Sequence, residues 1–308
     1  MFAVLYAVVL GALVGTVQLL QMQLPEDEPE VAPQPVAEFI AVPPKPEGAQ
    51  VSEGDGEGQL YTEEGCRART DDYREACFHA LALQRAERDP EGAMDACEEL
   101  SEDRLECIAD VAELHSVVDR EWSEQTCATM IPVEERKWHG QCWFGIALAW
   151  STEDYDYSRG MCEKALDWKN FCRHDVNGEI AQVDPEAAFD WCEQTDMSEL
   201  QLKGCYHGLG KYLGRVDVPK ALEICRRIDT GQVIHPQQCF HGLGWAVAES
   251  DPEGALGLCR SDGGDYRDSC YLGVSANMKR FDPGRAFEIC DMVSDEKLRR
   301  GCEKFAAR

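Results

Sequence analysis

The cysteines are the residues of this sequence with the most evident chemistry. The 308-residue chain holds 16 of them, an even number. Two cysteines separated by two residues would suggest a zinc ribbon, a thioredoxin-like redox site or haem attachment, but no such pair occurs. Disulfide formation is therefore the predicted chemistry, and it requires an oxidising compartment outside the cytosol.

The spacing of the cysteines repeats along the chain. Seven pairs have a constant separation of 20 positions: Cys77/Cys97, Cys107/Cys127, Cys142/Cys162, Cys172/Cys192, Cys205/Cys225, Cys239/Cys259 and Cys270/Cys290. An aspartate stands 12 positions after the first cysteine of each pair: Asp89, Asp119, Asp154, Asp184, Asp217, Asp251 and Asp282. Such a fixed spacing indicates repeated structural units.

The aspartates predict helix starts. An aspartate before a helix accepts hydrogen bonds from the free backbone N–H groups of the first turn, and proline suits the first helical position. Proline follows four of the seven aspartates: Pro90, Pro185, Pro252 and Pro283. We expect one helix to end before each aspartate and another to begin after it.

Each unit is predicted to be a helix hairpin. Glycine-rich stretches such as 205–210 and 239–244 precede the aspartates and indicate buried helices whose backbones approach closely. Alanines follow the aspartates and give the second helix a packing stripe. No strand pattern competes, so the predicted fold is all-α, an α-solenoid of about seven stacked, disulfide-stapled hairpins.

Two disulfide schemes fit the spacing. Pairing across the constant gap would leave Cys66 and Cys302 single. Pairing across the variable gap joins the second helix of one unit to the first helix of the next and uses every cysteine, which favours it. Its bridges are Cys66–Cys77, Cys97–Cys107, Cys127–Cys142, Cys162–Cys172, Cys192–Cys205, Cys225–Cys239, Cys259–Cys270 and Cys290–Cys302.

The N-terminal 60 residues differ from the repeats. Residues 1–22 are largely apolar, long enough to cross a bilayer as a helix, and are predicted to be a membrane anchor or a signal peptide. Residues 23–60 hold seven prolines, nine acidic residues and one lysine, which predicts a disordered acidic linker rich in proline and glycine. Residues 61–308 form the predicted helical repeat domain.

The charge balance limits the partners. The chain has 58 acidic and 30 basic residues and a formal net charge of −28, which argues against nucleic acid and against an anionic membrane surface. One catalytic motif occurs, a Ser-x-x-Lys match at 294–297, but the motifs that accompany it in enzymes of that kind are absent from the sequence. We therefore expect no enzyme activity, no cofactor, no metal site and no catalytic residue.

Histidines and tyrosines of the first helices form the candidate binding surface. Four histidines stand two residues after the first cysteine of their unit, and packing or capping is their expected role. Equivalent residues of neighbouring repeats are expected to lie too far apart to share a metal ion. Tyrosines of the same helices could line a concave face that holds a peptide. The candidate residues are His79, His174, Tyr206, His207, Tyr212, His241 and Tyr271.

The unit around residues 209–221 resembles the Sel-like repeat of the tetratricopeptide-like superfamily, and most closely its bacterial cysteine-rich branch. The resemblance rests on Leu209-Gly210, Tyr212, Gly214, Val216-Asp217 and Lys220-Ala221, and it covers residues 61–308 loosely. It implies bridges from a second helix to the following first helix, and extracytoplasmic protein binding. The Asp-Pro turns depart from the longer glycine-rich connection of that family.

These observations predict an exported, membrane-tethered scaffold of helical repeats that binds another protein or a peptide in the cell envelope. The partner is expected to be basic, and only the N-terminal segment is expected to contact the membrane. The predicted location is extracytoplasmic, in the periplasm or at the cell surface. The alternative is a hydrolase-like envelope enzyme with a site assembled between repeats.

Overall fold

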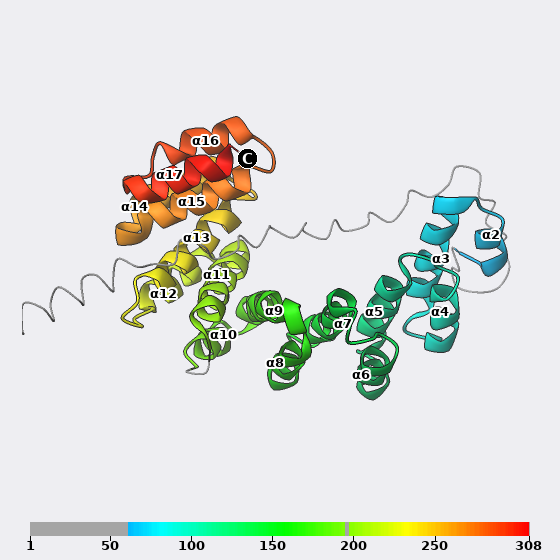
Figure 1. Cartoon of the computed structure of the whole chain (residues 1–308). Coiled ribbons are helices and arrows are strands. Elements are labelled where there is room, and N and C mark those ends of the chain that lie inside the picture. The colour runs from blue at the N-terminus through cyan, green and yellow to red at the C-terminus, as the bar shows by residue number, and fades with distance from the viewer. Residues whose placement is uncertain (1–60, 195–196, 308) are drawn as a thin grey trace, which may run out of the picture. The chain divides into compact units, whose positions relative to one another are not determined.

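The computed structural model describes residues 61–194 and 197–307, and all regular structure within these ranges is helical (Figure 1). The α-helices are α2 (Glu63–Arg67), α3 (Asp71–Arg85), α4 (Pro90–Cys97), α5 (Arg104–His115), α6 (Arg120–Thr129), α7 (Arg136–Ala149), α8 (Tyr155–Lys164), α9 (Lys169–Val183), α10 (Pro185–Cys192), α11 (Glu199–Val216), α12 (Val218–Arg227), α13 (Ile234–Ala248), α14 (Pro252–Asp262), α15 (Arg267–Met278), α16 (Pro283–Cys290) and α17 (Glu296–Ala306). Two short 3-10 helices, η1 (Leu166–Trp168) and η2 (Gly264–Tyr266), precede α9 and α15.

The helices pair as seven successive hairpins. These are α3/α4, α5/α6, α7/α8, α9/α10, α11/α12, α13/α14 and α15/α16, with α2 before them and α17 after them. The first helix of each hairpin also packs against the first helix of the next hairpin, from α3 to α15. This serial packing is the organisation of an α-solenoid, so the predicted fold class is confirmed.

All seven aspartates begin the second helix of their hairpin, as predicted. The side chain of each aspartate accepts a hydrogen bond of 2.9–3.1 Å from the backbone N–H three residues later. At Asp184 and Asp217 the turn consists of a single residue, because each aspartate ends the first helix and begins the second. These short turns hold the two helices of a hairpin side by side.

Eight disulfides join each second helix to the next first helix. The pairing is that of the variable-gap scheme, with Cα–Cα distances of 5.4–5.7 Å, and no cysteine is free. The first bridge attaches α2 to α3 and the last attaches α17 to α16. All sixteen cysteines are at most 5% exposed, so the bridges belong to the core. Disulfides in this number indicate an oxidising, extracytoplasmic location.

Glycines allow the first helices α11, α13 and α15 to pack with their backbones in contact. A Cβ atom on Gly242 would lie 2.2 Å from the carbonyl oxygen of His207, and one on Gly273 would lie 1.9 Å from that of His241. Both distances are far below van der Waals contact, so neither position has room for a side chain. The predicted close approach at recurring glycines is confirmed.

The predicted membrane anchor or signal peptide and the predicted linker lie in residues 1–60, outside the described residues. Within the described ranges, none of the helices combines the length and apolar character that crossing a membrane requires.

Candidate binding face on the first helices

One side of each first helix carries the side chains at the second, third, sixth and tenth positions after its first cysteine. The second, sixth and tenth positions are successive turns of the helix, and the third directly follows the second. All four therefore lie on the same side of the helix. We call this side the first-helix face. Its residues used below are His79, Asp110, Glu113, His174, Asp175, His207, Lys211, Arg215, His241, Trp245 and Glu249.

Three of the four recurring histidines stack across α9, α11 and α13. Nε2 of His174 and Nδ1 of His207 share a hydrogen bond of 2.7 Å, and their ring centres are 5.0 Å apart. The rings of His207 and His241 are also 5.0 Å apart. The expectation that equivalent histidines of adjacent repeats stand far apart is therefore wrong here, because the glycine contacts draw these helices together.

Burial keeps His207 and His241 of this stack neutral. Burial lowers the pKa of His207 well below its ordinary value, and the neighbouring histidines lower it further. Burial alone lowers the pKa of His241 to about 4. A protonated ring in the stack would lie in a poorly solvated position beside other imidazoles, so the neutral form is favoured in the folded protein.

Tyr212 joins α11 to α9 next to the histidine stack. Its hydroxyl donates a hydrogen bond of 2.9 Å to Asp175 Oδ1, which also lies 2.5 Å from Nδ1 of His174. Burial alone would raise the pKa of Asp175, but the interactions with His174 and Tyr212 outweigh it and lower the pKa. A Cβ atom on Gly178 would lie 2.2 Å from the Tyr212 ring, so this ring fills the space above that glycine.

Tyr206 and Tyr271 are buried in the core. They are 0% and 4% exposed, and both stand one position after the first cysteine of their unit, away from the first-helix face. The Tyr206 hydroxyl donates a hydrogen bond of 2.6 Å to Glu193. Tyr206 also lines a cavity of about 330 Å³, together with polar residues that include Glu199 and His235. The structure therefore gives these two rings packing roles.

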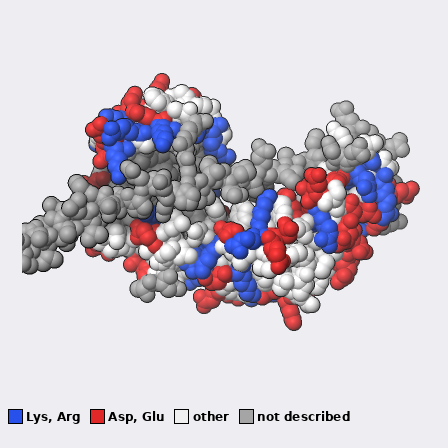
Figure 2. Space-filling model, in the orientation of Figure 1, with Lys and Arg blue, Asp and Glu red and all other residues white. Residues whose placement is uncertain are grey.

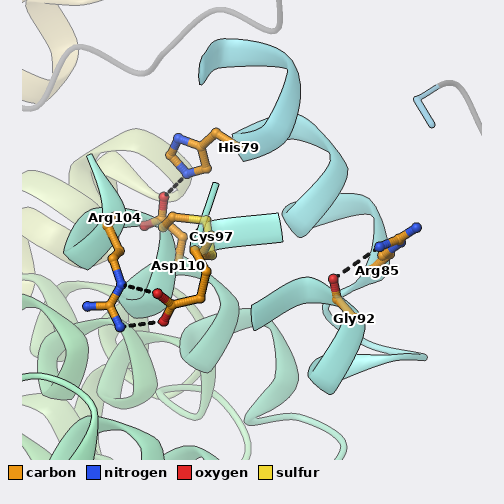
Figure 3. Close-up of a disulfide and its surroundings, with 8 residues drawn as sticks. His79, Arg85, Gly92, Cys97, Arg104 and Asp110 are labelled. Atoms are coloured by element: carbon orange, nitrogen blue, oxygen red, sulfur yellow. Dashed lines mark hydrogen bonds and ion pairs between the residues drawn. A yellow bond between two sulfur atoms is a disulfide. The ribbon is translucent and has the colours of Figure 1, made fainter. Parts of the chain in front are cut away.

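The fourth recurring histidine, His79, contacts an acidic row on α5. His79 Nε2 lies 2.9 Å from Asp110 Oδ2, and this pair is close to the Cys97–Cys107 bridge (Figure 3). The hydrogen bond with Asp110 raises the pKa of His79. Glu106 and Glu113 flank Asp110 by about one turn on either side, so three carboxyl groups follow one side of α5.

Glu113 is the functional candidate that the sequence analysis missed. Its carboxyl group packs on Gly145 of α7, where an added Cβ atom would lie 2.3 Å from Glu113 Oε2. Among the described residues, no donor or cation pairs with this carboxyl group. Burial, with a smaller contribution from Asp110, raises the pKa of Glu113 to about 7. A carboxylate that is desolvated and unpaired is a candidate binding group.

Lys211 of α11 occupies the same position of its repeat as Glu113, six residues after the first cysteine. Its Nζ atom lies 5.5 Å from the centre of the Tyr212 ring and 5.4 Å from that of the Trp245 ring. In the part of the chain that the structure describes, no carboxylate pairs with it. Burial lowers the pKa of Lys211 and the charge of Arg215 lowers it further, whereas the carboxylates of Asp175 and Glu249 raise it in part. Sequence analysis could have noticed both residues, because Leu83, Leu148 and Trp245 make this position mainly apolar.

The ionisation of Glu113 should reduce stability at neutral pH. Its folded-state pKa of about 7 lies above the ordinary value of 4.5, so the folded state binds more protons than the unfolded state in this window. The stability contribution of the protonated carboxyl is therefore lost as the pH rises through about 7. We expect Glu113→Gln to match the native protein near about pH 4 and to be more stable by about 1–3 kcal/mol near about pH 8.

Urea unfolding at the two pH values measures this difference. Glu121→Gln is the control, because Glu121 is exposed in the first turn of α6. An equal effect of the two substitutions at high pH would show that Glu113 is ordinary in the folded protein.

The structure places no metal cluster on this face. Within residues 61–194 and 197–307, no group of three or more His, Cys, Asp or Glu side chains is arranged to hold a metal ion. The Ser294 hydroxyl accepts a hydrogen bond of 2.7 Å from Arg267, and its backbone N–H donates one of 2.9 Å to Asp268. These contacts hold the turn before α17.

Comparison of the chain with protein-family models, with curated proteins and with solved structures found no match. The resemblance to the Sel-like repeat stays a prediction.

Proposed function

We propose that this protein is an exported scaffold of Sel-like type that binds a basic segment of a protein or peptide on the first-helix face of its N-terminal repeats. Its place would be the cell envelope, in the periplasm or at the cell surface, with the N-terminal segment as a membrane tether. The observation that carries the proposal is the unpaired, poorly solvated carboxyl group of Glu113.

A cationic side chain of a partner would relieve an unfavourable arrangement on α5. Glu113 lacks a cation, and its neighbour Asp110 disfavours its ionised form. The pKa of Glu106 is also raised, by burial first and then by Asp110 and Asp103, and the charges of His79 and Lys137 offset this only in part. Carboxylates held this close repel one another, and a lysine or arginine placed between them would favour all the charged forms. The gain is larger at a poorly solvated site than on an open surface.

The distribution of charge along the repeats favours the same partner. Residues 61–200 hold 34 acidic and 13 basic residues, whereas residues 201–308 hold 15 acidic and 16 basic residues. Nearly all the net negative charge of the repeats therefore lies in the N-terminal hairpins, and Figure 2 shows many acidic side chains over α3 to α6. Such a field attracts a basic segment and speeds its encounter.

The test is the binding of a lysine-containing peptide to the full chain. The protein is produced with its disulfides formed and kept in nonionic detergent, and the probe is a short peptide of lysine, glycine and serine with both ends blocked. Replacing both Glu106 and Glu113 by glutamine should weaken binding about tenfold or more. Glu91→Gln with Glu121→Gln removes the same charge from exposed positions of α4 and α6 and should weaken it less than about threefold.

Calorimetry at low and at moderate salt gives both affinities. Equal losses in the two double variants would mean that the probe responds to net charge alone, and the proposed site would be wrong.

A further inference from the structure

The surroundings of Lys211 point to a second ligand group of the opposite charge. We propose that Lys211 forms a site on α11 and α13 that binds a carboxylate of a peptide. The site takes either the carboxylate of an acidic side chain or that of a peptide C-terminus, since both present the same two oxygens.

The acidic groups near Lys211 already have donors of their own. Both carboxylate oxygens of Glu249 accept hydrogen bonds of 2.7 Å from the Arg215 guanidinium, and Trp245 Nε1 donates a third of 3.2 Å. Asp175 accepts from Tyr212 and pairs with His174. The protein therefore holds its nearest carboxylates in other pairs and leaves the ammonium group of Lys211 for an external acceptor.

Other charged groups act on this ammonium group. Burial and the charge of Arg215, with a smaller effect of Arg280 just after α15, lower the pKa of Lys211, whereas the carboxylates of Asp175 and Glu249 raise it. Arg280 is exposed, and its guanidinium lies 5.6 Å from the centre of the Phe281 ring. A carboxylate bound at the ammonium group would offset the effect of the two arginines and favour the charged form of Lys211.

The aromatic rings beside Lys211 suit a peptide better than a free ion. Tyr212 and Trp245 are half-buried, and both rings lie near the ammonium group. A peptide whose carboxylate reaches Lys211 would pack its adjoining residues on these rings, which supply apolar contact area at a low entropic cost.

The carboxylate site deepens the proposed function. Lys211 and Glu113 stand at the same position of hairpins that are three repeats apart, with opposite charge. If both sites hold one partner, that partner carries a basic segment and, farther along its chain, a carboxylate. This combination rests on the proposed function, whereas the carboxylate site alone does not.

The experiment uses peptides without positive charge, so that its outcome is independent of the acidic N-terminal hairpins. The full chain in nonionic detergent is titrated with three short N-acetylated peptides of glycine, serine and leucine, followed by NMR. One peptide has a free C-terminal carboxylate, the second has a C-terminal amide, and the third has the amide and one internal glutamate. We expect the first, the third or both to bind, and the uncharged amide to bind at least about tenfold more weakly.

Variants of Lys211 complete the test. Lys211→Met keeps an aliphatic chain near the rings and removes the charge, and it should weaken carboxylate binding about tenfold or more. Arg300→Gln removes one positive charge from an exposed i,i+4 pair on α17 and should leave the affinity within about twofold. The proposal is overturned if no carboxylate peptide shifts any signal at about 10 mM, or if Lys211→Met binds as well as the native chain.

Discussion

Replacing Gly273 by alanine should lower the free energy of unfolding by about 3 kcal/mol. The new Cβ atom would lie 1.9 Å from the carbonyl oxygen of His241 and 2.9 Å from the backbone nitrogen of Trp245. Both atoms belong to the backbone of α13, which cannot rotate aside as a side chain can. The overlap can be relieved only by separating α15 from α13, and this separation would also disturb the core that the two hairpins share.

The matched control is Gly257→Ala in α14. No atom lies within 4 Å of the position that a Cβ would take on Gly257. Alanine has the higher helix propensity, so this variant should gain about 0.5–1 kcal/mol. Urea unfolding followed by circular dichroism compares the two variants. A loss of stability in both, or in neither, would contradict the role of Gly273 in helix contact.

Removing the Cys225–Cys239 bridge should lower the free energy of unfolding by about 3 kcal/mol. The bridge closes a sequence separation of 14 residues and joins α12 to α13, between the fifth and the sixth of the seven hairpins. Substitution of both cysteines by alanine frees this segment in the unfolded chain. Because both sulfur atoms are in the core, the variant also leaves small voids that add to the loss.

The comparison variant lacks the terminal bridge between Cys290 and Cys302. That bridge attaches only α17 to the last hairpin, so its loss should release α17 while the earlier hairpins keep their stability. Hydrogen exchange read by mass spectrometry distinguishes the two cases. The internal variant should show faster exchange in α11 to α14, and the terminal variant in α17. Fast exchange along the whole chain in the terminal variant would argue against repeats that depend mainly on their neighbours.

The hairpins and their bridges could be predicted from the sequence because they depend on nearby residues. Each cap involves an aspartate and a backbone N–H three residues later. Each bridge closes a separation of 10–15 residues. Interactions of this range leave a periodic record in the sequence, and the constant spacing of cysteine and aspartate is that record.

The binding face could not be predicted to the same degree, because it depends on distances between repeats. Gly208 and Gly242 allow backbone contact between neighbouring first helices, and the histidine stack forms because of this contact. The distances between the rings that result cannot be deduced from the sequence. The carboxyl group of Glu113, whose pKa burial raises, packs on Gly145, 32 positions later in the next hairpin. Tyr206 stands beside a first-helix histidine in the sequence, yet its position on the helix turns its ring into the core.

The most direct test of the proposed function is the pKa of Glu113, measured by carbon NMR of the side-chain carboxyl group in the free full chain and in the chain saturated with the lysine peptide. The signal is assigned by its absence in Glu113→Gln. We predict a pKa of about 7 in the free protein and a clear decrease in the complex, because a bound ammonium group favours the carboxylate. A pKa near the ordinary value of 4.5 in the free protein, or one that the bound peptide leaves unchanged, would contradict a binding site for a basic segment at α5.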